Sequence, residues 1–96
     1  MMNSTSTDRL QQGFSVRGRV QGVGFRWWTQ RTGSELRLVG AVWNRPDGAV
    51  EVHVIGPAPA VEAFATELSQ GPQGAQVDGL ERFASDRSLP SRFVIE

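Results

Sequence analysis

Apolar and polar residues alternate in the first part of the chain, where Phe14, Val16 and Val20 are separated by polar residues and glycine. A period of two is typical of a strand with one buried face. From Phe25 the apolar spacing lengthens to three and four residues, which predicts a helix. The expected buried stripe of this helix consists of Phe25, Trp28, Thr32 and Leu36.

The middle of the chain predicts a hairpin. Two strand-like segments, 39–43 and 49–55, flank the sequence Asn44-Arg45-Pro46-Asp47-Gly48, whose residue types favour a turn. In the second segment the alternating valines lie on one face of the strand. They are Val50, Val52 and Val54.

The last third predicts a second helix and two strands. The helix is expected to begin at Gly56-Pro57-Ala58-Pro59, since proline suits a first helical turn, and to end at Gly71-Pro72. Strands are expected at 76–83 and, briefly, at 93–95. The order β-α-β-β-α-β with a short extra C-terminal strand predicts an α+β sandwich, with two helices on one face of a mainly antiparallel sheet.

Length and composition limit the domains and the partners. The 96 residues suffice for one domain. The polar stretch 1–12 is expected to be a disordered tail, which leaves residues 13–96 as the domain. Ten arginines balance ten acidic residues and no apolar run could span a membrane, so neither nucleic acid nor a membrane is an expected partner. The absence of cysteine is typical of a cytoplasmic protein.

The segment Gly18-Arg19-Val20-Gln21-Gly22-Val23-Gly24-Phe25-Arg26 runs from the first strand into the first helix and suggests an anion site. Glycines allow successive backbone N–H groups to face one hollow, and a helix start adds free N–H groups and a positive dipole end. Arg26 supplies a planar fork that matches two phosphate oxygens. Most glycine-rich turns bind nothing, and the nucleotide-binding P-loop signature is absent because the chain has no lysine.

Topology brings a second candidate to this hollow. A right-handed crossover makes the first two strands parallel, so their C-terminal ends lie on the same edge of the sheet. Asn44 ends the second strand. Its carboxamide can hold a water near a phosphorus atom without repelling the phosphate, although an asparagine that only opens a turn is equally ordinary.

Composition also removes mechanisms. Without cysteine there is no covalent thiol intermediate, and with His53 as the one histidine there is no site of several histidine ligands. The four aspartates form no cluster in the sequence, so neither a metal nor a cofactor is expected. His53 itself is expected to be a solvated strand residue.

Two segments together resemble the signatures of acylphosphatases: Gly18-x-Val20-Gln21-Gly22-Val23-x-Phe25-Arg26 and Gly40-x-Val42-x-Asn44-x-x-Asp47-Gly48-x-Val50. The likeness extends over residues 14–96 in the order and length of the elements. It implies a ferredoxin-like fold, a monomer, and metal-independent hydrolysis of the carboxyl–phosphate bond of acyl phosphates. It also implies that Arg26 is the catalytic, phosphate-binding arginine, that Asn44 positions the attacking water, and that the backbone of Gln21, Gly22, Val23, Gly24 and Phe25 cradles the phosphate.

The chain departs from the usual pattern of that family at several positions. Arg37 stands after the first helix where glycine is usual, and Gly33 lies inside the helix where alanine is usual, at a cost of about 1 kcal/mol. A left-handed backbone at Arg37 would add a similar cost. Trp43 stands where a polar residue is usual, and Ala41 stands where a bulky residue is usual. Both positions lie on one face of the strand. Trp27 and Trp28 are expected in the core or in a pocket wall.

Two other classes of function remain open. A non-catalytic ferredoxin-like module could bind RNA or a protein partner through the open sheet face, which would carry Arg17, Arg19, Trp43, Glu51 and His53. An RNA-binding sheet stacks bases on several aromatic side chains, and this face offers one. The family signature also occurs as an accessory domain of larger hydrogenase-maturation proteins. No pocket for a particular acyl group is legible in the sequence.

Overall fold

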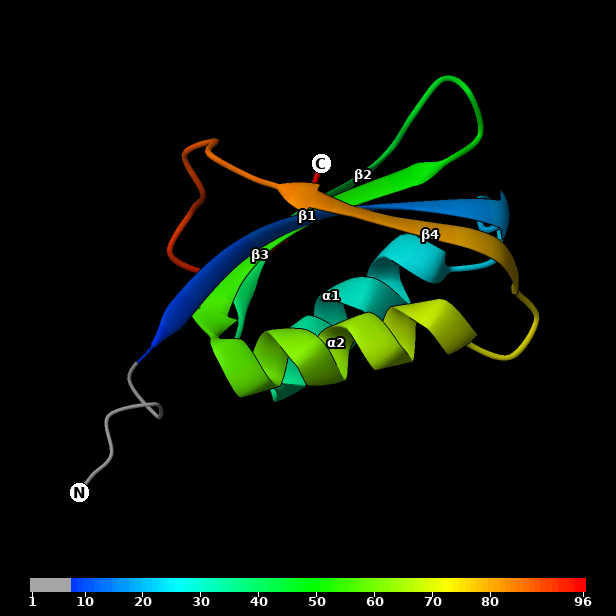
Figure 1. Ribbon diagram of the computed structural model, residues 1–96. Helices are drawn as coiled ribbons and strands as arrows, with labels where there is room; N and C mark the ends of the chain where they lie inside the picture. The colour runs from blue at the N-terminus through cyan, green and yellow to red at the C-terminus, as the bar shows by residue number, and fades with distance from the viewer. Residues whose placement is uncertain (1–7) are drawn as a thin grey trace.

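The computed structural model describes residues 8–96. Both helices pack against the same face of a twisted sheet, and the other face carries no helix (Figure 1). Within these residues neither helix is long and apolar enough to cross a membrane. The elements are β1 (Arg9–Arg19), α1 (Phe25–Glu35), β2 (Val39–Asn44), β3 (Val50–Pro57), α2 (Ala58–Gln70), β4 (Gln76–Ala84) and β5 (Phe93–Ile95).

The strands form one sheet in the order β4-β1-β3-β2-β5. β3 pairs antiparallel with β1 on one side and with β2 on the other, and β1 also pairs antiparallel with β4. Only the short β5 runs parallel to its neighbour, β2. This arrangement is the predicted ferredoxin-like α+β sandwich. Because two antiparallel steps separate β1 from β2, these two strands are parallel, as the crossover rule predicts.

Phenylalanines and valines fill the space between the sheet and the helices. Phe14 of β1 meets Phe64 of α2 edge to face at 5.9 Å between ring centres, and Phe64 contacts Phe93 of β5 at 6.1 Å. All three rings are buried, and burying such a side chain contributes about 1.5–3 kcal/mol each. The alternating valines of β3 complete this core and are fully buried.

The buried side of α1 differs from the predicted stripe. Phe25, Thr29 and Gly33 are buried, whereas Trp28, Thr32 and Leu36 are half-buried. The difference arises at Gly33, because the ring of Phe93 occupies the space that a Cβ at this residue would need. The glycine therefore allows the helix to approach β5 closely. This packing role accompanies the cost of about 1 kcal/mol that glycine has inside a helix.

The first strand begins earlier than predicted. Residues 9–12, which the sequence assigned to the tail, form the start of β1, where Arg9 pairs with Pro57 and Gln12 with both Val54 and Ala84. The tail assignment is therefore wrong for these four residues, while residues 1–7 lie outside the described part. The sequence did not predict this strand end because its side chains are polar. In the structure the Gln11 amide donates hydrogen bonds to Ser85 Oγ and Arg87 O in the β4–β5 connection.

The helix α1 ends in a six-residue backbone loop of the Schellman type. The N–H of Leu38 donates to Gly33 O at 2.9 Å, and the N–H of Arg37 donates to Ser34 O at 3.0 Å. This cap requires a left-handed residue, and Arg37 supplies it with φ 63°. A side chain in this conformation carries strain that a glycine would not.

We predict that Arg37→Gly stabilises the protein by about 1 kcal/mol, because it relieves the left-handed strain while keeping both cap hydrogen bonds. Urea unfolding would measure the change. Arg37→Ala is the matched control, since it removes the guanidinium but keeps a Cβ at positive φ. Equal stabilisation by both variants would show that charge, rather than backbone strain, is the cause.

Candidate functional site

The predicted anion hollow lies in the connection between β1 and α1. Gly22 and Gly24 have φ values of 78° and 75°, which side chains rarely tolerate. A Cβ built at either glycine would meet no atom within 4 Å, so no side chain fills the space beside them. Alternating backbone conformations of this kind turn neighbouring N–H groups toward one concavity that suits an anion.

The start of α1 adds donors to this hollow. Gly24 is the N-cap residue and no side chain caps the helix. The first intrahelical bond runs from Trp28 N to Gly24 O at 3.0 Å, which leaves the amides of Phe25, Arg26 and Trp27 without intrahelical acceptors. The first turn contains no acidic residue, so the positive end of the helix dipole is not neutralised locally.

Arg26 is the second residue of α1, and its side chain is anchored from the far end of the chain. Its Nη1 donates to the backbone oxygen of Glu96 at 3.1 Å, and Glu96 N donates to Val42 O at 2.8 Å. No acidic side chain of residues 8–96 forms an ion pair with this guanidinium. Sequence reasoning missed the role of Glu96, because its position depends on how β5 pairs with β2.

Asn44 is the last residue of β2 and is exposed. A turn-forming asparagine accepts a hydrogen bond from a backbone N–H two residues on. Here Asp47 does so instead, accepting from Ala49 N at 3.0 Å, and Gly48 takes the positive φ of 94°. Within residues 8–96 the Asn44 carboxamide forms no hydrogen bond, so it is available to a ligand.

Gln21 joins the hollow to the hairpin that carries Asn44. Its Nε2 donates to the carbonyl oxygens of both Arg45 and Ala49 at 2.9 Å. The β1–α1 connection and the β2–β3 hairpin accordingly lie at the same end of the molecule (Figure 1). The predicted site residues therefore gather at one sheet edge, and Gln21 contributes a structural side chain in addition to its backbone.

Two of the predicted cradle residues direct their side chains into the core. The side chain of Phe25 is buried in the core, and that of Val23 packs against the same core. The side chains of these residues thus stabilise the loop, and their main-chain N–H groups remain available to bind an anion. Among residues 8–96, no group of three or more metal-ligating side chains is positioned to hold a metal ion.

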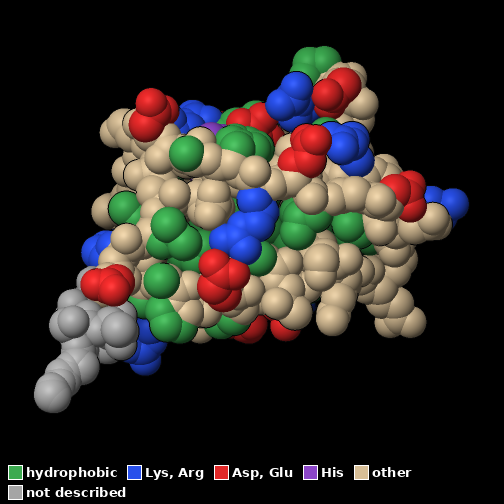
Figure 2. Space-filling view, viewed as in Figure 1, with side chains coloured by type: hydrophobic (Ala, Val, Ile, Leu, Met, Phe, Trp, Pro, Cys, Tyr) green, Lys and Arg blue, Asp and Glu red, His purple; other side chains and the backbone are tan. Residues whose placement is uncertain are grey.

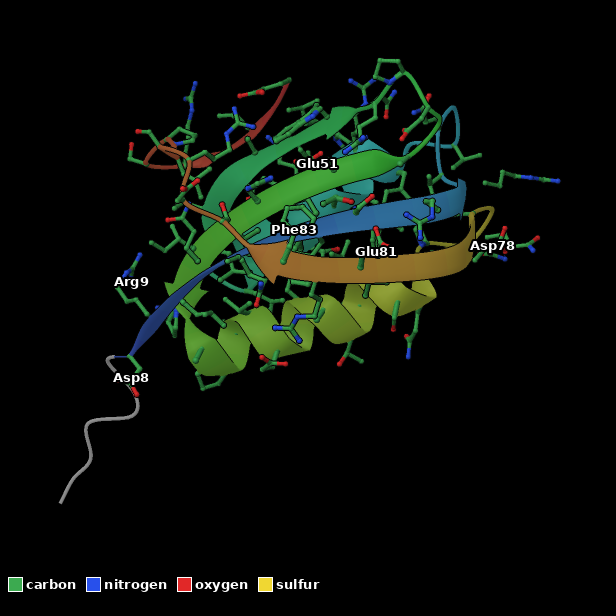
Figure 3. The ribbon with its side chains drawn as sticks, turned by 45° about the horizontal axis from the view of Figure 1, so that its top comes forward. Asp8, Arg9, Glu51, Asp78, Glu81 and Phe83 are labelled. Carbon is green, nitrogen blue, oxygen red and sulfur yellow. The ribbon has the colours of Figure 1, made fainter. Side chains whose placement is uncertain are left out.

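His53 is buried, so the expectation of a solvated strand residue is wrong. Its ring stacks on Trp43 at 5.3 Å, while Nδ1 lies 2.6 Å from Ser85 Oγ and Nε2 lies 2.7 Å from Glu51 Oε2. The burial follows from the β4–β5 connection, which brings Ser85 across the sheet. Figure 3 shows Glu51 and Phe83 on this face, and the Phe83 ring meets His53 edge-on.

Glu51 is shared between His53 and the hairpin. Its Oε1 accepts a hydrogen bond from Arg45 Nη1 at 2.8 Å. Partial burial raises the pKa of the Glu51 carboxyl, but the hydrogen bonds from His53 and Arg45 outweigh this effect and hold that pKa below its usual range. The carboxylate thus stays ionised at neutral pH and ties the hairpin to β3.

The sheet face without helices is a poor platform for nucleic acid. Trp43 on this face is half-buried, and the guanidinium of Arg87 covers its ring at 4.3 Å from the ring centre. Arg17 on the same face is paired with Glu81 at 3.0 Å. On the side of the molecule drawn in Figure 2, basic and acidic side chains are interspersed and form no patch of one sign.

The two tryptophans at the start of α1 behave differently. Trp28 packs against Phe25 at 5.3 Å and lines a groove of about 300 Å³ between the helices, as predicted for a pocket wall. Trp27 is exposed, so it lies outside the core.

Comparisons with known proteins agree with this architecture. The acylphosphatase family model matches residues 12–95. An acylphosphatase of Nitrobacter hamburgensis is 50% identical over 66 residues, which are 69% of this chain and 67% of that relative. The crystal structure of a Bacillus subtilis acylphosphatase has a TM-score of 0.82 and 39% identity, and covers 90% of this chain and 97% of its own. A Coxiella burnetii acylphosphatase has a TM-score of 0.88 and 27% identity, and covers 99% and 100%.

We predict that Gln21→Glu destabilises the protein by about 1–3 kcal/mol, because a carboxylate would face two carbonyl oxygens that now accept hydrogen bonds. Urea unfolding would measure the loss, and amide hydrogen exchange should be faster in residues 45–49. Gln73→Glu, in an exposed loop, is the control and should change stability by less than about 0.5 kcal/mol. A similar small effect of both variants would contradict the bridging role.

Proposed function

Since this chain belongs to the acylphosphatase family, we propose that it hydrolyses the carboxyl–phosphate bond of acyl phosphates through Arg26, the 21–25 backbone loop and Asn44. Membership of the family assigns the chain to this class of hydrolase. The observation that supports the residue roles most strongly is the Gln21 bridge, which keeps the glycine loop and the Asn44 hairpin at one sheet edge.

The phosphoryl group is held by backbone N–H groups and by a guanidinium that forms no ion pair within residues 8–96. The backbone N–H groups of the loop and the first turn of α1 bind the non-bridging oxygens, and the guanidinium of Arg26 binds two of them as a fork. Arg26 keeps its hydrogen bond to Glu96 O, which fixes the orientation of the fork before substrate arrives. These donors stabilise the oxygens as charge redistributes in the transition state.

Asn44 aims the attacking water from the end of β2. The attacking and leaving oxygens lie roughly in line through phosphorus, so the water approaches from the side opposite the acyl group. A neutral amide suits this position, because it accepts a hydrogen bond from water and does not repel the phosphate. The phosphate of the substrate accepts the proton that the water loses.

The leaving group explains why so little acid–base machinery is needed. A carboxylate is a weak base and departs without protonation, so positioning and charge stabilisation supply the catalysis. Hydrolysis of benzoyl phosphate by the purified protein, with and without EDTA, tests the proposal. We expect turnover that EDTA leaves unchanged. An inactive, folded protein would instead favour the non-catalytic binding module.

Two further expectations from the sequence stay predictions. We propose that the chain acts as a monomer, which equilibrium sedimentation of the purified protein would test. We also propose that it works in the cytoplasm, where fractionation of cells expressing the full chain would locate it. Discrimination between different acyl phosphates requires contacts with the acyl group, and the proposed phosphate cradle does not contact that group.

We predict that Arg26→Ala lowers kcat/KM by at least about 10²–10³-fold and abolishes inhibition by inorganic phosphate, because a preorganised donor is lost. Arg26→Lys should rescue activity poorly, since an ammonium cannot reproduce the planar fork. Steady-state kinetics and phosphate inhibition measure both effects. Arg17→Ala, which removes an arginine that is paired with Glu81, is the control. Full activity of the lysine variant would refute the fork.

We predict that Asn44→Ala lowers kcat by about 10²-fold while inhibition by inorganic phosphate stays nearly unchanged, because water is misplaced but the cradle is intact. Asn44→Asp should in addition weaken phosphate inhibition, since a carboxylate repels the anion. Normal turnover of benzoyl phosphate by the alanine variant would show that Asn44 serves only the turn.

A further inference from the structure

Among residues 8–96, Trp27 is the most exposed of the large apolar side chains, at 58% of its full accessibility. It follows Arg26 directly and is the third residue of α1. Its ring also carries a partner, because the Arg31 guanidinium lies 4.6 Å from the ring centre. This exposed aromatic surface is held in one orientation by a cation, on the first turn of the helix that carries Arg26.

The lean of helical side chains places this ring near the rim of the hollow. Side chains of a helix tilt toward its N-terminus and cover the turn that precedes them. Arg31 follows this rule, because it reaches back one turn to Trp27. The turn before Trp27 contains Val23 and Gly24, which belong to the hollow, and no side chain occupies the space beside Gly24.

The direction of an in-line reaction also places the leaving acyl group on the side of α1 that carries Trp27. Phe25, Thr29 and Gly33 form the buried side of α1 that faces the sheet. Trp27, two residues after Phe25, lies about 200° around the helix from it and therefore faces away from the sheet. Asn44 approaches from the sheet, at the end of β2. In an in-line displacement the acyl group leaves on the side opposite the water, which is the side of Trp27.

We infer that Trp27 is a specificity-determining residue that contacts the acyl group of the substrate and favours aromatic or bulky apolar acyl phosphates over acetyl phosphate. The inference rests on the proposed function, since it uses the direction of attack from Asn44. Arg31 is a positioning residue in this arrangement, because its guanidinium holds the indole in place. The phosphate cradle binds every acyl phosphate alike, so the Trp27 side chain is the group that discriminates between acyl groups.

Comparison of two substrates tests the inference. Trp27→Ala should lower kcat/KM for benzoyl phosphate about three- to tenfold, the range expected for one aromatic contact. For acetyl phosphate the change should stay below about twofold, because a methyl group offers little surface to the ring. Trp27→Phe should retain most of the preference for benzoyl phosphate, and inhibition by inorganic phosphate should be the same in all three proteins.

Phe83→Ala is the matched control, since it removes a partly exposed aromatic on β4, on the face away from the helices, and should leave the ratio of the two substrates unchanged. Equal losses for both substrates, or no loss for either, in Trp27→Ala would overturn the inference. If the unaltered protein hydrolyses neither substrate, the proposed function itself fails. Activity with an unaltered ratio in Trp27→Ala would remove only the role of Trp27.

Discussion

The antiparallel pairing of β3 with both β1 and β2 is the constraint on which the site depends. It makes β1 and β2 parallel without direct contact, so that the loop after β1 and the residue that ends β2 lie at one edge. The buried valines of β3 hold this register against the core, and a shift by one residue would turn them to solvent. Gln21 then closes the remaining gap with two hydrogen bonds. The position of a carboxamide relative to an anion cradle thus follows from sheet pairing.

Backbone conformation is used differently at the two ends of α1. At the start, Gly22 and Gly24 take positive φ values without strain and leave open space beside the loop. At the end, Arg37 takes φ 63° with a full side chain. In the proposed mechanism the space beside Gly22 and Gly24 receives the phosphate, whereas a side chain at the end of α1 costs only stability. Backbone strain is thus found at the end of α1, and unstrained glycines are found in the loop that we propose binds the phosphate.

Much of the fold, and the position of the candidate site within it, could be predicted from the sequence because local patterns determine the helices and strands. Period-two and helical spacing identified the elements, and the crossover rule brought Asn44 to the glycine loop. The burial of His53 could not be predicted, since it depends on the path of the β4–β5 connection that brings Ser85 to the ring. The anchoring of Arg26 by Glu96 depends on β5 in the same way. The polar start of β1 was hidden because Gln11 pairs with that same connection. Each missed feature involves a contact between residues distant in sequence.

The site divides recognition between main chain and side chain. In the proposed mechanism the phosphate contacts backbone N–H groups and one guanidinium, which recognise its charge and geometry but not the group attached to it. Because the cradle side chains of Phe25 and Val23 are committed to the core, substitution there would disturb the fold before it altered substrate choice. The exposed outer side of α1 has no such commitment. On the inference drawn for Trp27, substitutions on this helix face change the choice of acyl group while the proposed phosphate cradle stays the same.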